Sequence, residues 1–277
     1  MIEYMRGSGR DFSALKKLWV ECFNDTSAGY KTFFKNNRKN LRIYVARDDT
    51  QIVSALYHIT CTVAGEQAHY LFGASTTAKQ RNKGIMQKLV KYSLNDALLL
   101  GDKFSLLYPA NDSLYGYYSR FGYERKCHRK QTKITRDSLM HIAEYGGFCL
   151  SMTVNSMAKL RINGIDNSSV CFDSEYIKYS VAATKHYGGY VVCSGSGYAL
   201  IEEDKFGECV VSELFAEKDD VFSLLGKVLE ASKAKRFVFN YPLNMKVFNE
   251  EKVVEDGMIN FLSDLKINDV YIGLRNQ

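Results

Sequence analysis

Residues 75–89 read Ser-Thr-Thr-Ala-Lys-Gln-Arg-Asn-Lys-Gly-Ile-Met-Gln-Lys-Leu and join an apolar strand to an amphipathic helix. The residue pattern predicts the strand over residues 68–77 and the helix over residues 84–100. The basic residues of the connecting loop are Lys79, Arg81 and Lys83. The first amides of a helix have no partner within it, and the helix dipole adds positive charge there. The segment therefore predicts a binding site for an anion, above all a phosphate.

Gly84 strengthens this interpretation because a residue without a side chain lets the backbone approach a ligand closely. Other phosphate motifs do not fit. The sequence contains no Gly-x-x-x-x-Gly-Lys-Ser/Thr motif, and Gly195-Ser196-Gly197 lacks the third glycine and the following helix of a dinucleotide site. Spacing alone leaves an ordinary exposed loop as the alternative.

The elements around this segment indicate an α/β (α+β) domain. Strands are predicted over residues 2–6, 41–47, 51–62, 68–77 and 103–108, and helices over residues 12–23, 30–37, 84–100 and 111–120. The pattern restarts after about residue 145. There, helices are predicted over residues 172–187 and 219–233, and strands over residues 197–202, 208–216 and 236–240.

An internal echo suggests that the two halves share one architecture. The two prolines of the chain both follow a tyrosine at the end of a predicted strand, in Tyr108-Pro109 and Tyr241-Pro242. Each strand is preceded by a helix, and each helix by a strand. In the second half, the strand that ends near Ala216 meets its helix without a basic loop. A ligand of that loop is therefore expected in the first half alone.

The run Arg81-Asn82-Lys83-Gly84-Ile85-Met86 resembles the acyl-CoA loop of the GNAT superfamily of N-acetyltransferases, whose pattern is Arg/Gln-x-x-Gly-x-Gly/Ala. Arg81 and Gly84 match this pattern, whereas Met86 replaces the last small residue. A bulky residue at that position is similar to what the Eis-type (enhanced intracellular survival) branch shows. Downstream, Tyr118-Ser119-Arg120-Phe121-Gly122-Tyr123 resembles the family signature Tyr-x-x-x-Gly-Phe/Tyr.

The resemblance implies a GNAT fold, with a mixed, mostly antiparallel twisted sheet flanked by helices. The second half is similar to the degenerate second GNAT domain of Eis-type proteins. We therefore expect an acyl-CoA-binding catalytic domain over residues 1–140, in tandem with a GNAT-like domain without the pyrophosphate loop over residues 141–277.

The activity that the resemblance implies is transfer of an acetyl group from acetyl-CoA to a primary amine of a small molecule or peptide, by direct attack. Tyr118 would be the general acid. The residues implied in cofactor binding are Ser75, Thr76, Thr77, Arg81, Asn82, Lys83, Gly84, Ile85, Met86 and Asn111. A packing role for Tyr118, and a non-catalytic acyl-CoA-binding regulatory module, are the alternatives.

No motif in the sequence identifies the general base that would take a proton from the amine. Glu66 and His69 are the nearest candidates, because they lie on the strand before the loop. A water chain is an alternative to both, and a histidine on an aromatic strand can equally be a structural residue.

Composition indicates which partners, metal sites and membrane segments are not expected. The net charge of +6 is mild, and a nucleic-acid binder usually concentrates far more charge on one face, so no nucleic-acid partner is expected. One local basic cluster fits either a solvated edge or a site for a phosphate or an acidic partner. The cluster comprises Arg120, Arg125, Lys126, Arg129, Lys130, Lys133 and Arg136. The seven cysteines form no Cys-x-x-Cys pair, so neither a metal site nor a disulfide framework is expected. No segment reaches the roughly 18 apolar residues of a membrane span, which predicts a cytoplasmic protein without a membrane partner.

Overall fold

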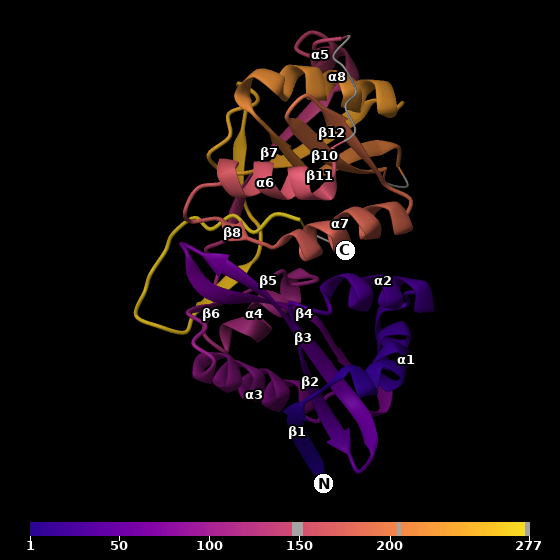
Figure 1. The fold of residues 1–277 in the computed structure, drawn as a ribbon, viewed down its shortest axis with the longest axis vertical. Coiled ribbons are helices and arrows are strands. Elements are labelled where there is room, and N and C mark those ends of the chain that lie inside the picture. The colour runs from indigo at the N-terminus through magenta and orange to yellow at the C-terminus, as the bar shows by residue number, and fades with distance from the viewer. Residues whose placement is uncertain (146–151, 204–205, 275–277) are drawn as a thin grey trace. The chain divides into compact units, whose positions relative to one another are not determined.

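The computed structural model describes residues 1–145, 152–203 and 206–274 (Figure 1). Cys149, one of the seven cysteines, lies outside the described residues. The chain divides into two compact units. The first unit consists of Met1–Arg125 and Gly257–Lys266, and the second consists of Lys126–Asp256 and Ile267–Gln277.

The first unit is built on one mixed sheet with strand order β1-β2-β3-β4-β5-β14-β6. Its strands are β1 (Ile2–Arg6), β2 (Leu41–Asp48), β3 (Gln51–Val63), β4 (Glu66–Thr76), β5 (Phe104–Leu107), β6 (Tyr123–Glu124) and β14 (Met258–Phe261). Its helices are α1 (Phe12–Phe23), α2 (Ser27–Asn37), α3 (Ile85–Leu99) and α4 (Asp112–Ser119), with short 3-10 turns η1 (Gly9–Asp11) and η2 (Ala78–Gln80). Neighbouring strands in this order are antiparallel except β4 and β5, which are parallel. The predicted mixed, mostly antiparallel sheet flanked by helices is confirmed.

Helices cover both faces of this sheet (Figure 1). On one face, Leu89 and Val90 of α3 pack against Leu71 and other buried apolar residues of the strands. On the other face, Trp19 of α1 stacks on Phe33 of α2, with the two ring centroids 5.0 Å apart. These helices form where the sequence predicted them because their apolar residues recur at helical spacing.

The second unit repeats the mixed sheet, with strand order β13-β7-β12-β11-β10-β9. The strands of this sheet are β7 (His128–Thr135), β9 (Tyr190–Ser194), β10 (Gly197–Glu203), β11 (Glu208–Ala216), β12 (Arg236–Tyr241) and β13 (Lys252–Glu255). The two-residue strand β8 (Val170–Cys171) is not part of it. The helices of the second unit are α5 (Arg136–Met140), α6 (Val154–Gly164), α7 (Ser174–His186) and α8 (Val221–Ala231), with a short 3-10 turn η3 (Lys218–Asp220). β11 and β12 are its parallel pair. Among the described residues, no helix combines the length and the apolar character that a membrane span requires.

Each sheet contains a strand whose pairing partners lie far away along the chain. β14 lies between β5 and β6 in the first unit, so residues 258–261 pair with two strands that end by residue 124. β7 lies between β12 and β13 in the second unit. The predicted boundary after residue 140 therefore differs from the division seen here, because residues 126–140 pair and pack within the second unit.

This long-range pairing makes a sharp prediction for truncation. A fragment of residues 1–140 lacks β14, so β5 loses the partner that covers Leu107 and the buried Met258 leaves an exposed apolar gap. We expect the fragment to show no cooperative urea unfolding when followed by the fluorescence of Trp19, the single tryptophan of the chain.

The matched control is a chain of residues 1–125 joined by a short glycine-serine linker to residues 256–266. This control restores β14 to its sheet, so cooperative unfolding should return. Unfolding of the 1–140 fragment with the midpoint of the full chain would contradict the structural role of β14.

Candidate functional site

The parallel strands at the centre of the first unit pair over only part of their length. β4 pairs with β5 through residues 68–70 and 104–106. β4 then continues to Thr76, whereas β5 ends at Leu107. We call the end of this pairing, at Tyr70 and Leu106, the divergence point. Backbone N–H and C=O groups need partners, so the part of β4 beyond this point is suited to pairing with a ligand.

A β-bulge turns β4 away from β5 just beyond the divergence point. Ala55 faces Ser75 and Tyr57 faces Phe72, so Gly73 and Ala74 together occupy one step of the ladder. Gly73 has a φ of +60°, and a Cβ atom there would lie 2.8 Å from the Trp19 ring. Only glycine fits this position, because it tolerates both the left-handed backbone and the close ring.

The loop after β4 has the shape of an anion site. Asn82 and Gly84 adopt left-handed backbone conformations, with φ of 62° and 73°. α3 follows at Ile85, and its first internal hydrogen bond runs from the Lys88 amide to the Gly84 carbonyl. The amides before Lys88 thus have no helical acceptor, and successive amides in such a turn form a concave anion site.

The side chains of the loop divide between anchoring and charge. The Arg81 Nε donates to the Thr76 carbonyl at 3.0 Å and ties the loop to the end of β4. The Lys83 Nζ donates to Gln80 at 2.9 Å. Lys79, Arg81 and Lys83 are all exposed, so they add positive charge beside the free amides of α3.

The residues at the end of β4 are held by β3 through their side chains. The Ser75 hydroxyl donates to the Ala55 carbonyl at 3.3 Å, and Ser54 bridges the Ser75 carbonyl and the Thr76 hydroxyl. The amide of Thr77 donates to the Val53 carbonyl at 2.9 Å. These bonds fix the strand that leads into the loop.

Ile85 and Met86 open α3 on its apolar side. Ile85 is buried, and Met86 packs, partly buried, against the apolar cluster beneath α3. The bulky side chain that departs from the family pattern is thus accommodated in the core of the unit.

Asn111 and Tyr118 lie at opposite ends of α4. Asn111 is the exposed N-cap of that helix, and its Oδ1 accepts a hydrogen bond from Ser113 at 2.6 Å. Tyr118 is buried in the same apolar cluster as Leu89 and Leu107. Burial raises the pKa of Tyr118, and the neighbouring Tyr117 acts in the same direction. Tyr118 therefore keeps its proton across the physiological range.

Glu66 stands apart from the loop. It is exposed at the first position of β4, before the divergence point. Ser75 lies nine residues further along β4, which corresponds to about 30 Å of extended strand. The structure therefore does not bring Glu66 to the residues that surround Gly84.

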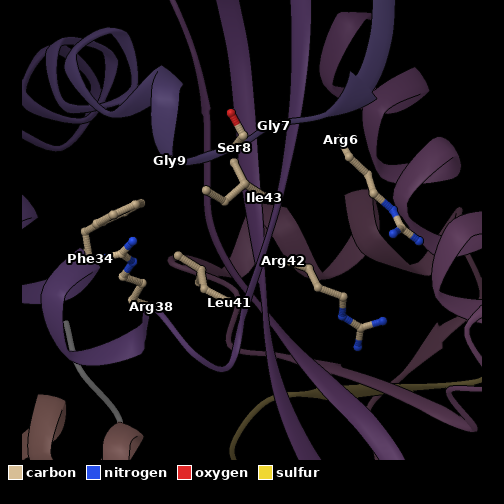
Figure 2. A pocket seen from close by; sticks show the side chains of 9 residues that line it. All are labelled: Arg6, Gly7, Ser8, Gly9, Phe34, Arg38, Leu41, Arg42 and Ile43. Carbon is tan, nitrogen blue, oxygen red and sulfur yellow. The ribbon is translucent and has the colours of Figure 1, made fainter.

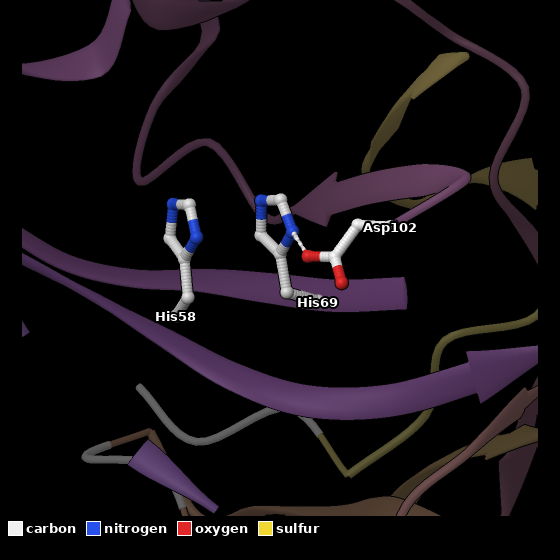
Figure 3. A group of neighbouring side chains, drawn as sticks. All are labelled: His58, His69 and Asp102. Carbon is white, nitrogen blue, oxygen red and sulfur yellow. Dashed lines mark hydrogen bonds and ion pairs between the residues drawn. The ribbon is translucent and has the colours of Figure 1, made fainter. Parts of the chain in front are cut away.

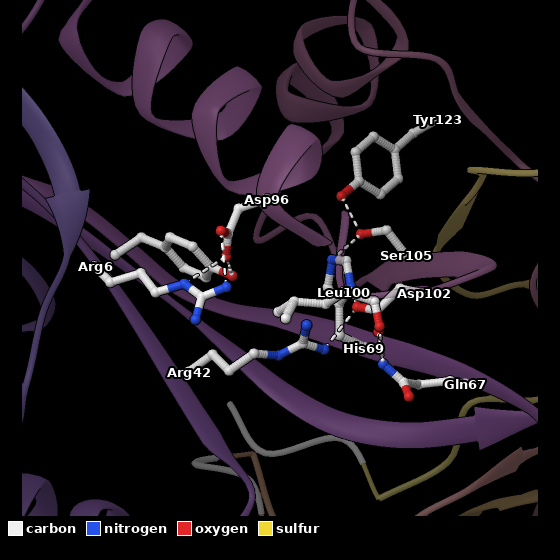
Figure 4. A network of polar contacts seen from close by, with 10 residues as sticks. Arg6, Arg42, Gln67, His69, Asp96, Leu100, Asp102, Ser105 and Tyr123 are labelled. Carbon is white, nitrogen blue, oxygen red and sulfur yellow. Dashed lines mark hydrogen bonds and ion pairs between the residues drawn. The ribbon is translucent and has the colours of Figure 1, made fainter. Parts of the chain in front are cut away.

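His69 belongs to a buried polar chain beneath the divergence point (Figures 3 and 4). Its Nδ1 lies 2.6 Å from an oxygen of Asp102, and its Nε2 lies 2.6 Å from the Ser105 hydroxyl. Ser105 in turn contacts the Tyr123 hydroxyl at 2.5 Å. Both ring nitrogens of His69 are thus engaged, and the side chain is fully buried.

Asp102 is the acceptor on which this chain converges. Arg42 and Gln67 each donate to it at 2.6 Å, in addition to His69 (Figure 4). Burial alone would raise the pKa of Asp102, but the hydrogen bonds from His69 and Gln67 and the charge of Arg42 hold the pKa below its usual value. The chain joins the end of α3 to β4, β5 and β6. Asp102 and Ser105 could not be assigned to it from spacing alone.

His58, His69 and Asp102 lie close enough together to be considered as metal ligands (Figure 3). The two imidazole rings stack with centroids 3.6 Å apart and planes 9° apart. A nitrogen lone pair lies in the plane of its ring, so nearly parallel rings cannot aim at one ion. The geometry fits a stacked structural pair rather than a metal centre.

A cavity of about 320 Å³ lies elsewhere in the first unit, along β2 (Figure 2). Its lining residues are Arg6, Gly7, Ser8, Gly9, Phe34, Arg38, Leu41, Arg42 and Ile43. Arg6 donates two hydrogen bonds to Asp96, each 2.8 Å long, and Arg42 donates to Asp102. None of the residues 75–89 is among those that line this cavity.

The basic cluster of the sequence is divided between the two units. Arg120 and Arg125 belong to the first, and the rest belong to the second. Arg129 pairs with Asp256, and Lys130 pairs with Glu251 at 2.8 Å. These partners favour the solvated-edge interpretation over a phosphate site.

The buried histidines make stability sensitive to acid. Burial lowers the pKa of His58 well below its usual value, and His69 and Arg42 act in the same direction. Burial also lowers the pKa of His69, although Asp102 opposes the shift. Unfolding restores pKa values of about 6.5, so the unfolded chain binds more protons below that pH. The contribution of these two histidines to the free energy of unfolding is therefore fully present above about pH 6.5. It falls as the pH drops, by up to about 1.4 kcal/mol per pH unit for each histidine.

The substitution His58→Phe tests this prediction because it keeps an aromatic ring on His69 and removes one titrating group. Urea unfolding followed by Trp19 fluorescence should show a shallower loss of stability between pH 7 and pH 5 in His58→Phe than in the natural chain. The exposed His186→Phe substitution is the control and should leave the slope unchanged. Equal slopes in all three proteins would contradict buried neutral imidazoles.

Comparison with known proteins agrees with this geometry. Residues 3–126 match the family model described as an acetyltransferase (GNAT) domain. A search of curated proteins finds no match. Among solved structures, a conserved protein of unknown function from Enterococcus faecalis V583 shares the fold with a TM-score of 0.76 and 15% identity, over 95% of this chain and 73% of that one.

Two further structures share the fold over 95% of this chain. One is a GCN5-related N-acetyltransferase from Anabaena variabilis, with a TM-score of 0.74, 14% identity and 73% of its own length covered. The other is Eis1 from Mycobacterium abscessus, with a TM-score of 0.69, 14% identity and 74% of its own length covered. The chain thus carries an acetyltransferase domain of the GNAT family over residues 3–126, within a two-unit fold that it shares with Eis1.

Proposed function

We propose that this chain is an acetyl-CoA-dependent N-acetyltransferase that moves an acetyl group to a primary amine by direct attack. The observation that carries the proposal is the loop before α3. Its left-handed Asn82 and Gly84 and the free amides that follow suit a pyrophosphate, and they lie at the end of the strand that diverges from β5. The match of residues 3–126 to an acetyltransferase domain supports the same activity.

Each part of the loop has a role in holding the co-substrate. The amides of Ile85 and Met86 and the charges of Lys79, Arg81 and Lys83 bind the pyrophosphate. Backbone groups of residues 73–76 that bond neither to β3 nor to Arg81 pair with the amide groups of the pantetheine arm of CoA, as the free edge of a strand does. Ser75, Thr76 and Thr77 hold this part of β4 in place through their bonds to β3. Asn111, exposed at the start of α4, adds a contact to the cofactor from the segment that follows β5.

The chemistry then needs few groups. The amine nitrogen attacks the thioester carbonyl, and backbone amides beside the Gly73 bulge stabilise the oxyanion. The carbon–sulfur bond breaks, and Tyr118 donates its proton or a hydrogen bond to the departing thiolate. A thiol pKa of about 8.5 lies below the raised pKa of Tyr118, so complete proton transfer is uphill and the hydrogen bond carries most of the effect.

The proton of the incoming ammonium needs an acceptor. His69 is engaged on both nitrogens, and Glu66 lies at the other end of β4. We therefore propose that a chain of water molecules accepts this proton and passes it from the open side of β4 to the solvent.

The direct test measures thiol release from acetyl-CoA with a panel of amines, including a diamine, an amino sugar and a lysine peptide. Amine-dependent release, with the acetylated amine identified by mass spectrometry, supports the transfer. Tight binding of CoA without release on any amine would instead favour a non-catalytic acyl-CoA-binding module.

Gly84→Ala tests the loop. An added Cβ meets open space within the chain, with the nearest atom 4.0 Å away, so the change costs only about 1 kcal/mol of backbone strain. It places a methyl group where the backbone should approach the pyrophosphate. We expect CoA to bind at least about tenfold more weakly by calorimetry, a change of about 1.4 kcal/mol.

Gly101→Ala is the matched control, because Gly101 has a φ of +91° at the opposite end of α3 and also faces open space. It should lower stability to a similar degree and leave CoA affinity unchanged. The same affinity in both variants and the natural chain would remove the loop from the proposal.

Tyr118→Phe tests the general acid. Loss of the hydroxyl should lower kcat by about 100-fold, as removal of a general acid does, with the affinity for CoA unchanged. Because its raised pKa keeps Tyr118 protonated, the natural enzyme should show no loss of kcat from this group between pH 7 and pH 9. Tyr117→Phe, on the same helix, is the control. An unaltered kcat in Tyr118→Phe would leave the tyrosine a packing residue.

A further inference from the structure

The second unit repeats the diverging strands of the first. β11 and β12 pair in parallel through residues 208–211 and 236–239, and β11 then continues to Ala216. A register shift against β10 leaves Ser212 as a bulge at the point where the pairing ends. The order of strand, 3-10 turn, helix and parallel strand is the same as for β4, η2, α3 and β5.

Side chains complete the end of this pairing. The Asn240 Nδ2 donates to the Val211 carbonyl at 2.9 Å, and Gln131 donates to the Asn240 Oδ1 at 3.0 Å. The amide of Asn240 thus takes the place of the next backbone bond between the strands. The separation of β11 from β12 is therefore a bonded arrangement rather than a frayed end.

A cavity of about 420 Å³ lies beyond this point, within the second unit. Its lining residues are Leu160, Asn163, Gly164, Phe215, Ala216, Glu217, Lys218, Val221, Asn244, Met245 and Lys246. They come from the end of α6, the end of β11, the start of α8 and the segment after β12. The size is within the range of small-molecule sites.

The lining does not suit a nucleotide pyrophosphate. α8 begins at Val221 directly after η3, without the intervening loop of the first unit. Asp219 and Asp220 precede the helix, and Asp220 accepts a hydrogen bond from the Ser196 amide at 2.6 Å. Two carboxylates at a helix start already neutralise its positive end and repel a multiply charged anion.

The lining instead combines apolar walls with two ammonium groups. Leu160, Phe215, Val221 and Met245 supply the walls. Lys218 and Lys246 are exposed lining residues, and Glu217 is the acidic residue of the lining. Asn163 and Asn244 add amide groups, and Asn244 is held in place by donating to the Gly164 carbonyl at 2.7 Å.

We propose that this cavity binds a small monocarboxylate with an apolar body and an internal amide, the class of N-acylated amino acids. The carboxylate pairs with Lys218 and Lys246. The apolar side chain fills the space between Leu160, Phe215 and Met245. The amide bonds to Asn163, Asn244 or the edge of β11. This site is additional to the cofactor site and does not depend on the proposed acetyl transfer.

The test titrates the full chain with N-acetyl-leucine by ligand-detected NMR. Saturable binding is expected, and N-acetyl-leucinamide, which lacks the carboxylate, should bind at least about tenfold more weakly, since a hydrogen-bonded charge contributes on the order of 1.5 kcal/mol or more. Lys246→Ala and Lys218→Ala should each weaken N-acetyl-leucine, whereas Lys233→Ala, an exposed lysine outside the lining, should not.

A filling variant separates the cavity from non-specific charge. Asn163 is exposed on the last turn of α6, so Asn163→Trp can occupy the cavity without disturbing the core. It should abolish binding of N-acetyl-leucine while CoA affinity stays unchanged. The proposal is overturned by equal affinity for the acid and the amide, by normal binding in both lysine variants, or by undiminished binding in Asn163→Trp.

Discussion

The incomplete pairing of β4 with β5 is the constraint on which the first unit depends. The two strands share hydrogen bonds over residues 68–70 and 104–106 and then separate. A parallel pair buried in the middle of a sheet would normally continue, so something must turn one strand away. The bulge at Gly73 does so, because two residues of β4 occupy one step opposite β3. The Trp19 ring beside Gly73 leaves no room for a side chain there.

The surroundings of the divergence point are arranged to keep it in place. Beneath it, Asp102, His69, Ser105 and Tyr123 form a buried chain that ties the end of α3 to three strands. Buried polar groups are costly unless they are bonded, so a chain in which each member has partners fixes a single arrangement. Beyond it, Arg81 holds the loop to the end of β4. The open edge of β4 and the start of α3 thus stand in a constant relation to each other.

The second unit applies the same backbone plan to a different chemistry. β11 also leaves its parallel partner at a bulge, but no basic loop follows, and aspartates precede the helix. What remains is a cavity with apolar walls and two lysines. On the function that we propose, the two units would use similar strand arrangements for a phosphate-binding turn in the first and an amphipathic cavity in the second. The difference rests on a few residues between a strand and a helix, where insertions do not disturb the core.

The sequence by itself determined the elements with strong periodicity, such as α1, α3 and β4, and it located the loop before α3 through Arg81 and Gly84. Both features are local, because a helix face and a glycine turn depend on residues close together in the chain. The sequence did not predict which distant strands pair with each other. β14 pairs with β5 across more than a hundred residues, and no local pattern encodes such a partner, so the boundary expected after residue 140 differs from the division of the units. Tertiary structure likewise decided the position of His69. A histidine on an aromatic strand can face a ligand or the core, and only the arrival of Asp102 and Ser105 from other elements engages both of its nitrogens.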